Sequence, residues 1–459
     1  MLFNSIYFCL FFLSVFILYW IMNAKNRWLL LLIASYFFYF SWEPIYLLLI
    51  VFSTLVDYLL CIYLTANPDK RKKKLGLALS VITNLALLFS FKYYDFFKSI
   101  VDGYSFSFHS LNDSKEASLL LPIGISFYTF QTLSYSIDVY RNKYLPEKHL
   151  GKFALFVSFF PQLIAGPIER ANNLLPQFNA NNVKLKLDDL RDGLLLFIWG
   201  LFKKVVVADN LRVLVDHVFD NPEFQSGGGI IFALFAFSFQ IYADFSGYSD
   251  MAIGLAKMLG IDLSVNFKTP YFSQNVTQFW RRWHITLSAW LKDYVYIPLK
   301  GSRGRSILTF RNVMITFVLA GLWHGASWGF VIWGAIHGLL VGVERLLGIR
   351  NSSSNQLLKL FRITITFLFI MLAWLPFRAE GVGQLSYLTI QLLSIDFSSL
   401  YIAFAENIYT PGVFGILFLL CSDFIFGKKG VLKMNELNWI FRYAWVALIF
   451  VLICFLGDT

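Results

Sequence analysis

Long apolar runs that do not alternate in polarity constrain this chain more than any other feature. Ile6 to Ile21 and Ala444 to Leu456 are both continuous hydrophobic stretches. A hydrocarbon core of about 30 Å is crossed by roughly 20 apolar residues in a helix. A transmembrane barrel would show short strands of alternating polarity instead. The runs therefore predict membrane-spanning α-helices.

The composition extends this prediction to the whole chain. Of the 459 residues, 57% are hydrophobic and 15% are charged, whereas soluble domains carry about 25% charged residues. The apolar excess recurs along the entire chain, which excludes a soluble enzyme with a single anchor. We expect an all-α polytopic membrane protein with about ten or more transmembrane helices.

The basic balance fits a membrane protein as well. Thirty-nine Lys and Arg against 28 Asp and Glu give a net charge of +11. Lys and Arg gather in cytoplasmic loops of membrane proteins, so topology explains the charge and no nucleic-acid partner is expected. The four cysteines lie in apolar runs without CxxC pairing, which predicts neither a disulfide framework nor a metal site. Leu2 to Met22 lacks a basic flank and a cleavage site, so we interpret it as a retained first span.

The positions of the Lys and Arg clusters predict the topology of the N-terminal part. The run from Lys70 to Lys74 is the densest, and Lys25 and Arg27 form a smaller cluster. Both clusters are predicted to be cytoplasmic loops, which places the N-terminus outside. The polar stretch from Asp95 to Ser118 is then an outer loop, and a span follows from about Leu119 to Ile137.

After Lys152 the apolar runs become shorter. Phe153 to Pro167 is interrupted by Pro161 and by Gly166-Pro167, and irregular backbone at membrane depth is tolerated only against protein or a water-filled cavity. We expect re-entrant segments around a central tunnel, and a loop at Gly227-Gly228-Gly229. No internal repeat at a fixed period is found, which weakens a transporter built on inverted repeats.

His324 is the most suggestive of the six histidines. It ends an apolar run, glycines flank it closely so that another chain or a substrate can approach, and Trp323 and Trp328 screen it from lipid. One interpretation is an interfacial histidine in an aromatic belt. The other is a general base with a pKa of about 6.5 that removes a proton from a hydroxyl attacking an acyl group. His337, further along, is assigned to helix packing.

A second histidine, His284, follows two adjacent arginines in a Trp-rich segment. Arg281 and Arg282 are typical of a membrane anchor at the cytoplasmic face. Alternatively, they form a basic rim with Lys300 and Arg303 that binds the phosphates of an acyl donor.

Two polar strings are unusual in an apolar chain. One runs from Tyr242 to Asp250 and includes Asp244, Ser246 and Tyr248, and the other contains Gln162. Such residues act either as polar contacts between helices or, with the histidines, as the wall of a polar cavity. The expected tunnel-lining residues are Asp244, Ser246, Tyr248, Trp323 and Gln162.

Four of these strings, taken in order, resemble the bacterial branch of the membrane-bound O-acyltransferase superfamily that acetylates alginate, peptidoglycan and cellulose. The matching strings span residues 160–170, 244–254, 279–298 and 322–338. The resemblance implies that His324 is catalytic and that His284 is a second polar residue along a tunnel. It also implies an acetyl-CoA donor on the cytoplasmic side, and an exported acetyltransferase partner that completes transfer to a polysaccharide.

We therefore predict a multi-pass O-acyltransferase of the bacterial inner membrane. Its single domain, residues 1–459, comprises N-terminal spans (1–118), a catalytic core (119–345) and C-terminal spans (346–459). Acetyl-CoA acts as donor substrate and no cofactor stays bound. The expected partners are a periplasmic or extracellular acetyltransferase, the exported polysaccharide and the lipid bilayer. The alternatives are D-alanyl transfer to teichoic acid from a carrier protein, and a non-enzymatic transporter or channel.

The topology can be tested with single cysteines at Asn112 and Asp69 in a cysteine-free background. The Lys/Arg asymmetry predicts that an impermeant thiol reagent applied outside labels a cysteine at position 112 and not one at position 69. Labelling of both positions from outside would contradict the predicted orientation.

Overall fold

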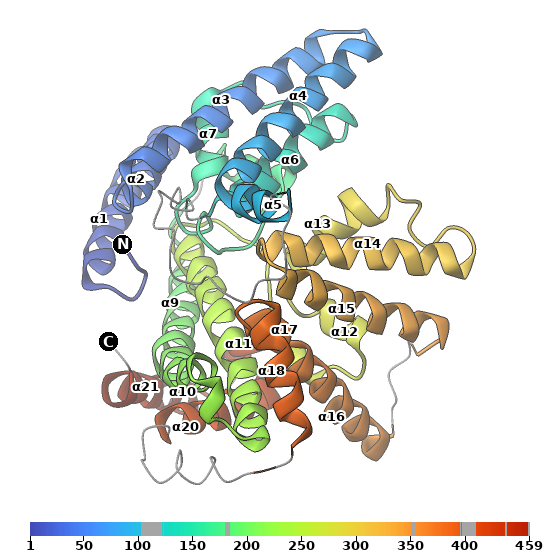
Figure 1. Ribbon diagram of the computed structural model, residues 1–459. Helices are drawn as coiled ribbons and strands as arrows, with labels where there is room; N and C mark the ends of the chain where they lie inside the picture. Colours follow the sequence, from blue (N-terminus) through green and yellow to red (C-terminus); the bar gives the residue numbers. More distant parts are fainter. Residues whose placement is uncertain are drawn as a thin grey trace. The chain divides into compact units, whose positions relative to one another are not determined.

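The computed structural model describes residues 1–101, 122, 124–179, 184–349, 355–394, 396, 410–436 and 438–457, and its regular elements in these parts are helices (Figure 1). Within these ranges no β-strand occurs. Helices that are long and apolar enough to cross a membrane are Pro44–Ala66, Lys70–Lys98, Gly227–Met258, Ser306–His324, Trp328–Leu346, Gln356–Arg378 and Trp439–Leu456. Two shorter apolar helices are Ile6–Ile21 and Pro411–Phe426. The prediction of an all-α polytopic membrane protein is confirmed. The expected number of about ten or more spans stays a prediction, since only the described part of the chain contributes to these nine helices.

The chain packs into two compact units. The first comprises Met1–Phe197 and Met251–Ser264, and the second comprises Ile198–Asp250 and Val265–Thr459. Two boundaries fall inside α9 (Leu187–Phe202) and α11 (Gly227–Met258), and the third lies between Ser264 and Val265. This division describes packing, and the proposed functional boundaries at 118 and 345 stay a prediction.

The first unit contains the candidate spans Pro44–Ala66 and Lys70–Lys98 together with shorter helices. α3, α4 and α6 pack against one another, and α7 packs against α2 and α3. Its further elements are α1 (Ile6–Ile21), η1 (Ala24–Asn26), α2 (Arg27–Phe40), α3 (Pro44–Ala66), α4 (Lys70–Leu88), η2 (Phe89–Tyr93), α5 (Tyr94–Val101), α6 (Ile125–Tyr140), α7 (Leu150–Ser158) and α8 (Ala171–Phe178).

Two segments predicted as loops are helical, and a third begins with a helix. The basic run from Lys70 to Lys74 forms the first turns of α4, because Asp69 caps the helix by accepting a hydrogen bond from the Arg71 amide at 2.8 Å and Lys and Arg are good helix formers. The predicted outer loop begins with α5, and its remainder, including Asn112, lies outside the described residues. Gly227 to Gly229 form the first turn of α11.

The segment from Phe153 to Pro167 breaks where its sequence predicts. α7 ends at Ser158, and residues 159–170 are not helical although most of them are buried. Buried backbone groups need partners. The Phe160 amide donates to the Ser35 hydroxyl at 3.1 Å, and the Gln131 side chain donates to the Phe156 carbonyl at 2.5 Å. Polar side chains from neighbouring helices thus supply contacts that a regular helix would make internally.

A buried polar cluster joins α3, α4 and α6 around Asp57, which is fully buried. The Asp57 carboxylate accepts hydrogen bonds from Ser80 at 2.5 Å and from the Asn84 amide at 2.9 and 3.0 Å. Thr132 on α6 donates to the Asn84 side-chain oxygen at 3.1 Å. This carboxyl group lies inside a candidate span, where an ionisable residue is costly unless it is satisfied.

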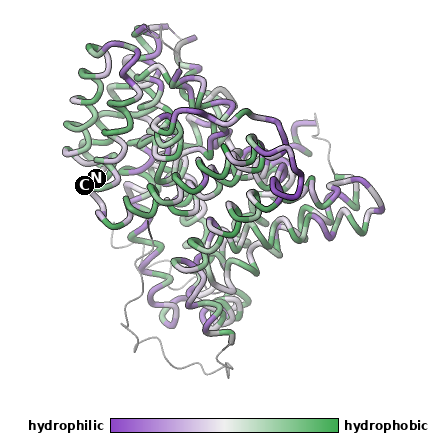
Figure 2. Tube along the Cα trace, turned by 90° about the horizontal axis from the view of Figure 1, so that it is seen from above, coloured by the Kyte–Doolittle hydropathy of each residue, from purple (hydrophilic) through white to green (hydrophobic). Residues whose placement is uncertain are grey.

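The second unit contains most of the longer helices. In Figure 2 the helical turns are largely hydrophobic, and hydrophilic residues gather mainly in the connections. Its elements after α9 and besides α11 are η3 (Lys203–Ala208), α10 (Asp209–Asp220), η4 (Pro222–Phe224), η5 (Pro270–Phe272), α12 (Val276–Trp280), α13 (Ile285–Leu291), η6 (Lys292–Tyr296), α14 (Ser306–His324), α15 (Trp328–Leu346), α16 (Gln356–Ala373), α17 (Leu375–Arg378), α18 (Gly381–Leu393), α20 (Thr410–Phe426), η7 (Gly427–Glu436) and α21 (Trp439–Leu456).

Helices α14 and α15 form a tight hairpin, which Figure 1 shows as two antiparallel yellow to orange helices. Glycines make this approach possible. A side chain at Gly321 would collide with the Phe330 carbonyl oxygen, and one at Gly334 would collide with the Phe317 carbonyl oxygen. Small residues at helix interfaces allow such backbone contact within membranes.

The Asp57 cluster generates a stability prediction. Asp57→Leu leaves the Ser80 hydroxyl and the Asn84 amide without their acceptor, at about 1–3 kcal/mol for each buried unsatisfied group. We expect a clear drop in the thermal midpoint of the detergent-solubilised protein. Asp57→Asn keeps an acceptor and similar size, and should melt closer to wild type. Equal midpoints for the two variants would show that packing alone holds these helices together.

Candidate functional site

The site lies in the second unit and is built on the turn between α14 and α15. His324 is the last residue of α14, as the end of the apolar run predicts, and Gly325 follows in an extended conformation. A side chain at Gly325 would collide with the Phe330 ring. The glycine therefore lets α15 of the same chain approach, rather than leaving open space beside the imidazole.

Aromatic rings surround the His324 imidazole, which is half-buried. Its ring centre lies 5.0 Å from Trp333, 5.2 Å from Phe377 and 4.9 Å from Trp323. The neighbours come from α14, α15 and α17. Partial exposure within an aromatic enclosure leaves the imidazole reachable while most of its surroundings exclude water.

The second histidine, His284, is fully buried and directly precedes α13. Its backbone is left-handed, with φ of +42° and ψ of 57°, a region that non-glycine residues occupy at a cost. Residues 266–268 hold this bend in place, since the Ile285 amide donates to the Asn266 carbonyl and the Lys268 amide donates to the Arg282 carbonyl, both at 2.9 Å. Strained backbone of this kind persists only where its surroundings over-determine it, and it clusters at functional sites.

Trp323 brings the two histidines into one group. Its ring centre lies 5.7 Å from His284 and 4.9 Å from His324. Phe245 on α11 packs edge-on against His284 at 4.6 Å. His284 lies outside the candidate spans. Burial, followed by the nearby charge of His324, lowers the pKa of the His284 imidazole well below its ordinary value, so this ring is neutral near pH 7.

His337 occupies a different position, on α15 and fully buried. Its Nδ1 accepts a hydrogen bond from the Trp280 indole at 3.2 Å. Near the end of the same helix, the Glu344 carboxylate accepts from the backbone amides of Val276 and Thr277 at 2.5 and 2.8 Å. Helix α15 therefore holds α12 at both ends, a contact of the kind expected from a packing residue. The dispensability of His337 for catalysis stays a prediction.

The proposed donor-binding cations differ in their surroundings. Arg281, Lys300 and Arg303 are exposed. Arg282 is half-buried, and its guanidinium donates to the backbone carbonyls of Phe272 at 3.0 Å and Thr269 at 3.4 Å. Arg282 thus holds the loop before α12, and the phosphate-binding role of all four residues stays a prediction.

The polar string on α11 finds its partners on η3. Ser246 is buried and accepts a hydrogen bond from Lys203, which also forms an ion pair with Asp250 at 2.7 Å. Asp244 is exposed and pairs with Lys204 at 2.7 Å. Tyr248 is half-buried. Neither acidic residue is brought against the histidines by a described contact, and the tunnel-lining role of the string is untested.

Gln162 lies in the first unit, in the irregular segment after α7. It is buried, and its amide donates to the Gln131 side chain at 2.7 Å. This contact joins two polar side chains among apolar surroundings. Its proposed place along a tunnel stays a prediction.

Two residues that position the site were missed in the sequence. Asn266 is fully buried, and its side-chain oxygen accepts from the Thr286 hydroxyl at 2.6 Å, which fixes the turn after His284. Glu344 anchors α12. Each of these two polar side chains stands among apolar residues, which could have marked it as important in the sequence. Their hydrogen-bond partners, however, are not sequence neighbours and could not be identified. Among the described residues, no group of three His, Cys, Asp or Glu side chains is placed to hold a metal ion.

Comparisons with known proteins agree on one family. Residues 2–375 match the model of the membrane-bound O-acyltransferase family. The chain is similar to a probable alginate O-acetylase AlgI of Pseudomonas aeruginosa, at 43% identity over 83% of this chain and 73% of that protein. It is also similar to a peptidoglycan O-acetyltransferase of Helicobacter pylori, at 39% identity over 83% of this chain and 78% of that protein. A teichoic acid D-alanyltransferase of Streptococcus thermophilus is 27% identical over 57% of this chain and 69% of that protein.

The left-handed backbone of His284 predicts which substitutions the site tolerates. Asparagine adopts this conformation readily, whereas a β-branched residue of similar size does not. We expect His284→Val to lower the thermal midpoint below that of His284→Asn, because backbone strain of this kind costs about 1–3 kcal/mol. Thermal unfolding of both variants in the same detergent measures the difference. A valine variant as stable as the asparagine variant would show that the turn relaxes.

Proposed function

This chain belongs to the membrane-bound O-acyltransferase family, and we propose that it passes acetyl groups from cytoplasmic acetyl-CoA across the membrane for O-acetylation of an exported or cell-envelope polysaccharide. Relatives named as alginate O-acetylase and peptidoglycan O-acetyltransferase support the acetyl group and a glycan acceptor. The single observation that carries the proposal is the pair of histidines around Trp323, one reachable and one fully buried.

In this proposal His324 is the general base. Its imidazole takes the proton of a hydroxyl whose oxygen attacks the acetyl carbonyl. The carbon–sulfur bond of the thioester then breaks, and the proton returns to the departing thiolate. General acid–base catalysis at a positioned histidine contributes about 10²- to 10⁴-fold in rate. The partial exposure of His324 among Trp323, Trp333 and Phe377 supports this role.

His284 acts as the second polar residue, in a neutral state. A buried neutral imidazole can donate one hydrogen bond and accept another, and the lowered pKa of His284 disfavours binding of a second proton. Its fixed backbone and its edge contact with Phe245 suit a positioning role beside Trp323.

The donor enters from the cytoplasmic face in this proposal. Arg281, Lys300 and Arg303 are exposed cations that can reach phosphates, and arginine binds phosphate in a bidentate manner. Arg282, which is tied to two backbone carbonyls, would shape the rim rather than contact the donor fully. The proposed location is the bacterial inner membrane, and a periplasmic or extracellular acetyltransferase partner completes transfer to the polysaccharide.

D-alanyl transfer from a carrier protein is the second candidate function. The teichoic acid D-alanyltransferases match at 25–27% identity over 57% of the chain. The O-acetylases match at 39–43% over 83% of it. The longer and stronger match favours acetyl transfer.

The catalytic prediction concerns His324→Ala. Removing the base should reduce acetyl ester on the exported glycan to near background, a loss of about 10²-fold or more, because no described neighbour of His324 within its ring cluster can replace it as a base. Ester is measured in cells that lack other acetylation systems and express equal amounts of each variant in the membrane.

His337→Gln is the matched control, because glutamine can still accept the Trp280 hydrogen bond. It should retain most of the activity. Substantial ester in the His324→Ala strain would mean that the catalytic residue lies elsewhere and that His324 is a packing residue.

A further inference from the structure

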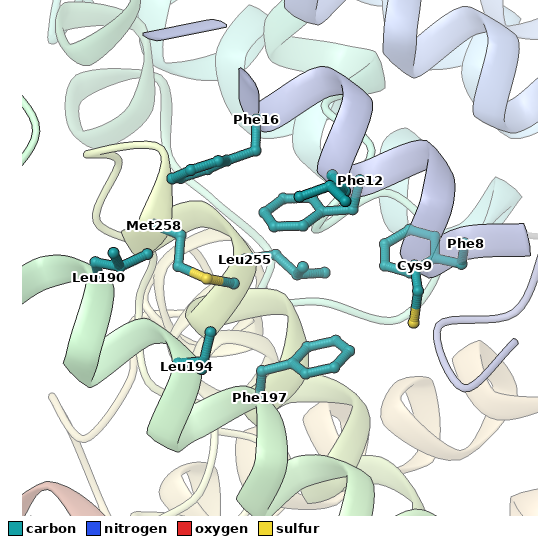
Figure 3. A pocket seen from close by; sticks show the side chains of 10 residues that line it. Phe8, Cys9, Phe12, Phe16, Leu190, Leu194, Phe197, Leu255 and Met258 are labelled. Atoms are coloured by element: carbon teal, nitrogen blue, oxygen red, sulfur yellow. The ribbon is translucent and has the colours of Figure 1, made fainter. Parts of the chain in front are cut away.

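An apolar groove in the first unit opens between α1 and the pair α9 and α11. Its volume is about 340 Å³, within the range of about 300–1,000 Å³ that is usual for small-molecule sites. Figure 3 shows side chains of the three helices facing the same space. The lining is apolar throughout: Phe8, Cys9, Phe12, Leu13 and Phe16 from α1, Leu190, Leu194 and Phe197 from α9, and Leu255 and Met258 from α11.

The helices that form the groove are placed by a glycine pair. A side chain at Gly193 would lie 2.6 Å from the Gly254 carbonyl oxygen, so α9 and α11 approach at backbone contact. Leu194 and Leu255, the next residues, then lie on one wall opposite α1. Leu255 and Met258 are buried, whereas Leu194 is 47% exposed, so the groove has a closed floor and an open side.

The two ends of the groove differ in polarity. At one end Phe8 is fully buried among Phe3, Phe38 and Phe160. At the other end, the Trp20 indole donates to the Met258 carbonyl at 3.3 Å, and the Arg27 guanidinium lies over the Trp20 ring at 4.7 Å. Lys257, beside Met258, pairs with Asp189 at 3.3 Å. The groove therefore runs from a charged rim to a blind apolar end.

We propose that this groove binds one acyl chain of a membrane phospholipid, with the lipid phosphate near Arg27. The apolar side chains at the open side of the groove, such as Leu13 on the apolar helix α1 and Leu194 on α9, are exposed. Water does not fill an apolar groove, and a void would forfeit dispersion contacts with its walls. An acyl chain is the molecule present at that depth. A cation with an indole at the rim complements a phosphate group at the membrane interface.

The basic residues that follow α1 also predict which leaflet of the membrane supplies this lipid. Lys25 and Arg27 follow α1 directly and are predicted to be cytoplasmic. The bound phospholipid therefore comes from the cytoplasmic leaflet. Its chain runs along α1 toward the opposite end, and its phosphate stays at the level of Trp20.

The test uses the full-length chain in vesicles of phosphatidylethanolamine and phosphatidylglycerol. A trace of either lipid carries a photoactivatable diazirine in its acyl chain, and adducts are mapped by peptide mass spectrometry. We expect adducts on α1 and α9 to be several-fold more abundant than those on α21. Helix α21 serves as the reference because its apolar side chains Phe450 and Phe455 are also exposed. Leu194→Trp fills the groove and should lower these adducts several-fold. Cys9→Trp should do the same from the opposite wall.

Leu10→Trp is the matched control, since Leu10 is 58% exposed on α1 and does not line the groove. It should leave labelling unchanged. Arg27→Gln should lower labelling by both phospholipids, and unchanged labelling would overturn the phosphate contact. Adducts spread evenly over α1 and α21, and unaffected by either tryptophan in the groove, would overturn the site and leave only the ordinary lipid annulus. A parallel set of vesicles carries a trace of an isoprenoid diazirine instead of the phospholipid probe. Preferential labelling of the groove by the isoprenoid would overturn the assignment to a phospholipid.

Discussion

The backbone contact between α14 and α15 is the interaction on which the rest of the candidate site depends. Glycines at 321 and 334 remove the side chains that would otherwise separate the two helices. With the helices this close, His324 at the end of α14 meets Trp333 on α15. The same helix α15 reaches α12 through His337 and Glu344. The imidazoles of His324 and His337 are thus held by interlocked helices rather than by a free loop, as a preorganised site needs.

The sequence allows the membrane class, the helical fold and the end of α14 at His324 to be predicted, because these follow from apolar runs and their breaks. The conformation of His284 could not be predicted. Its left-handed bend depends on pairing with residues near Asn266, which lies far from it along the chain. The anchoring role of Glu344 likewise depends on a tertiary contact. Hydrophobic periodicity predicts which face of a helix is buried. It does not predict which distant backbone group a side chain will bind.

The buried ionisable groups described above bind polar side chains of neighbouring elements, either an opposite charge or neutral donors. From its sequence, the polar string of α11 is either part of a cavity wall or a set of polar contacts between helices. Ser246 and Asp250 are four residues apart, so one helical face carries both. On that face they meet the same lysine, Lys203. Asp57 in the first unit finds hydroxyl and amide donors instead. A charge inside an apolar segment therefore marks either chemistry or helix assembly, and its partners decide which.

The helical form of the basic run affects how deeply this helix of the first unit is inserted in the bilayer. Lys70–Lys98 forms one candidate span of 29 residues, about 44 Å long at 1.5 Å per residue, against a hydrocarbon thickness of about 30 Å. The excess length carries its cations on a rigid rod into the headgroup layer. Because successive residues turn by about 100°, charges from Lys70 to Lys74 point all around the helix axis. Attraction between this basic helix end and anionic headgroups sets the depth of the helix in the bilayer but not its rotation about its own axis. Salt screens this attraction and weakens it.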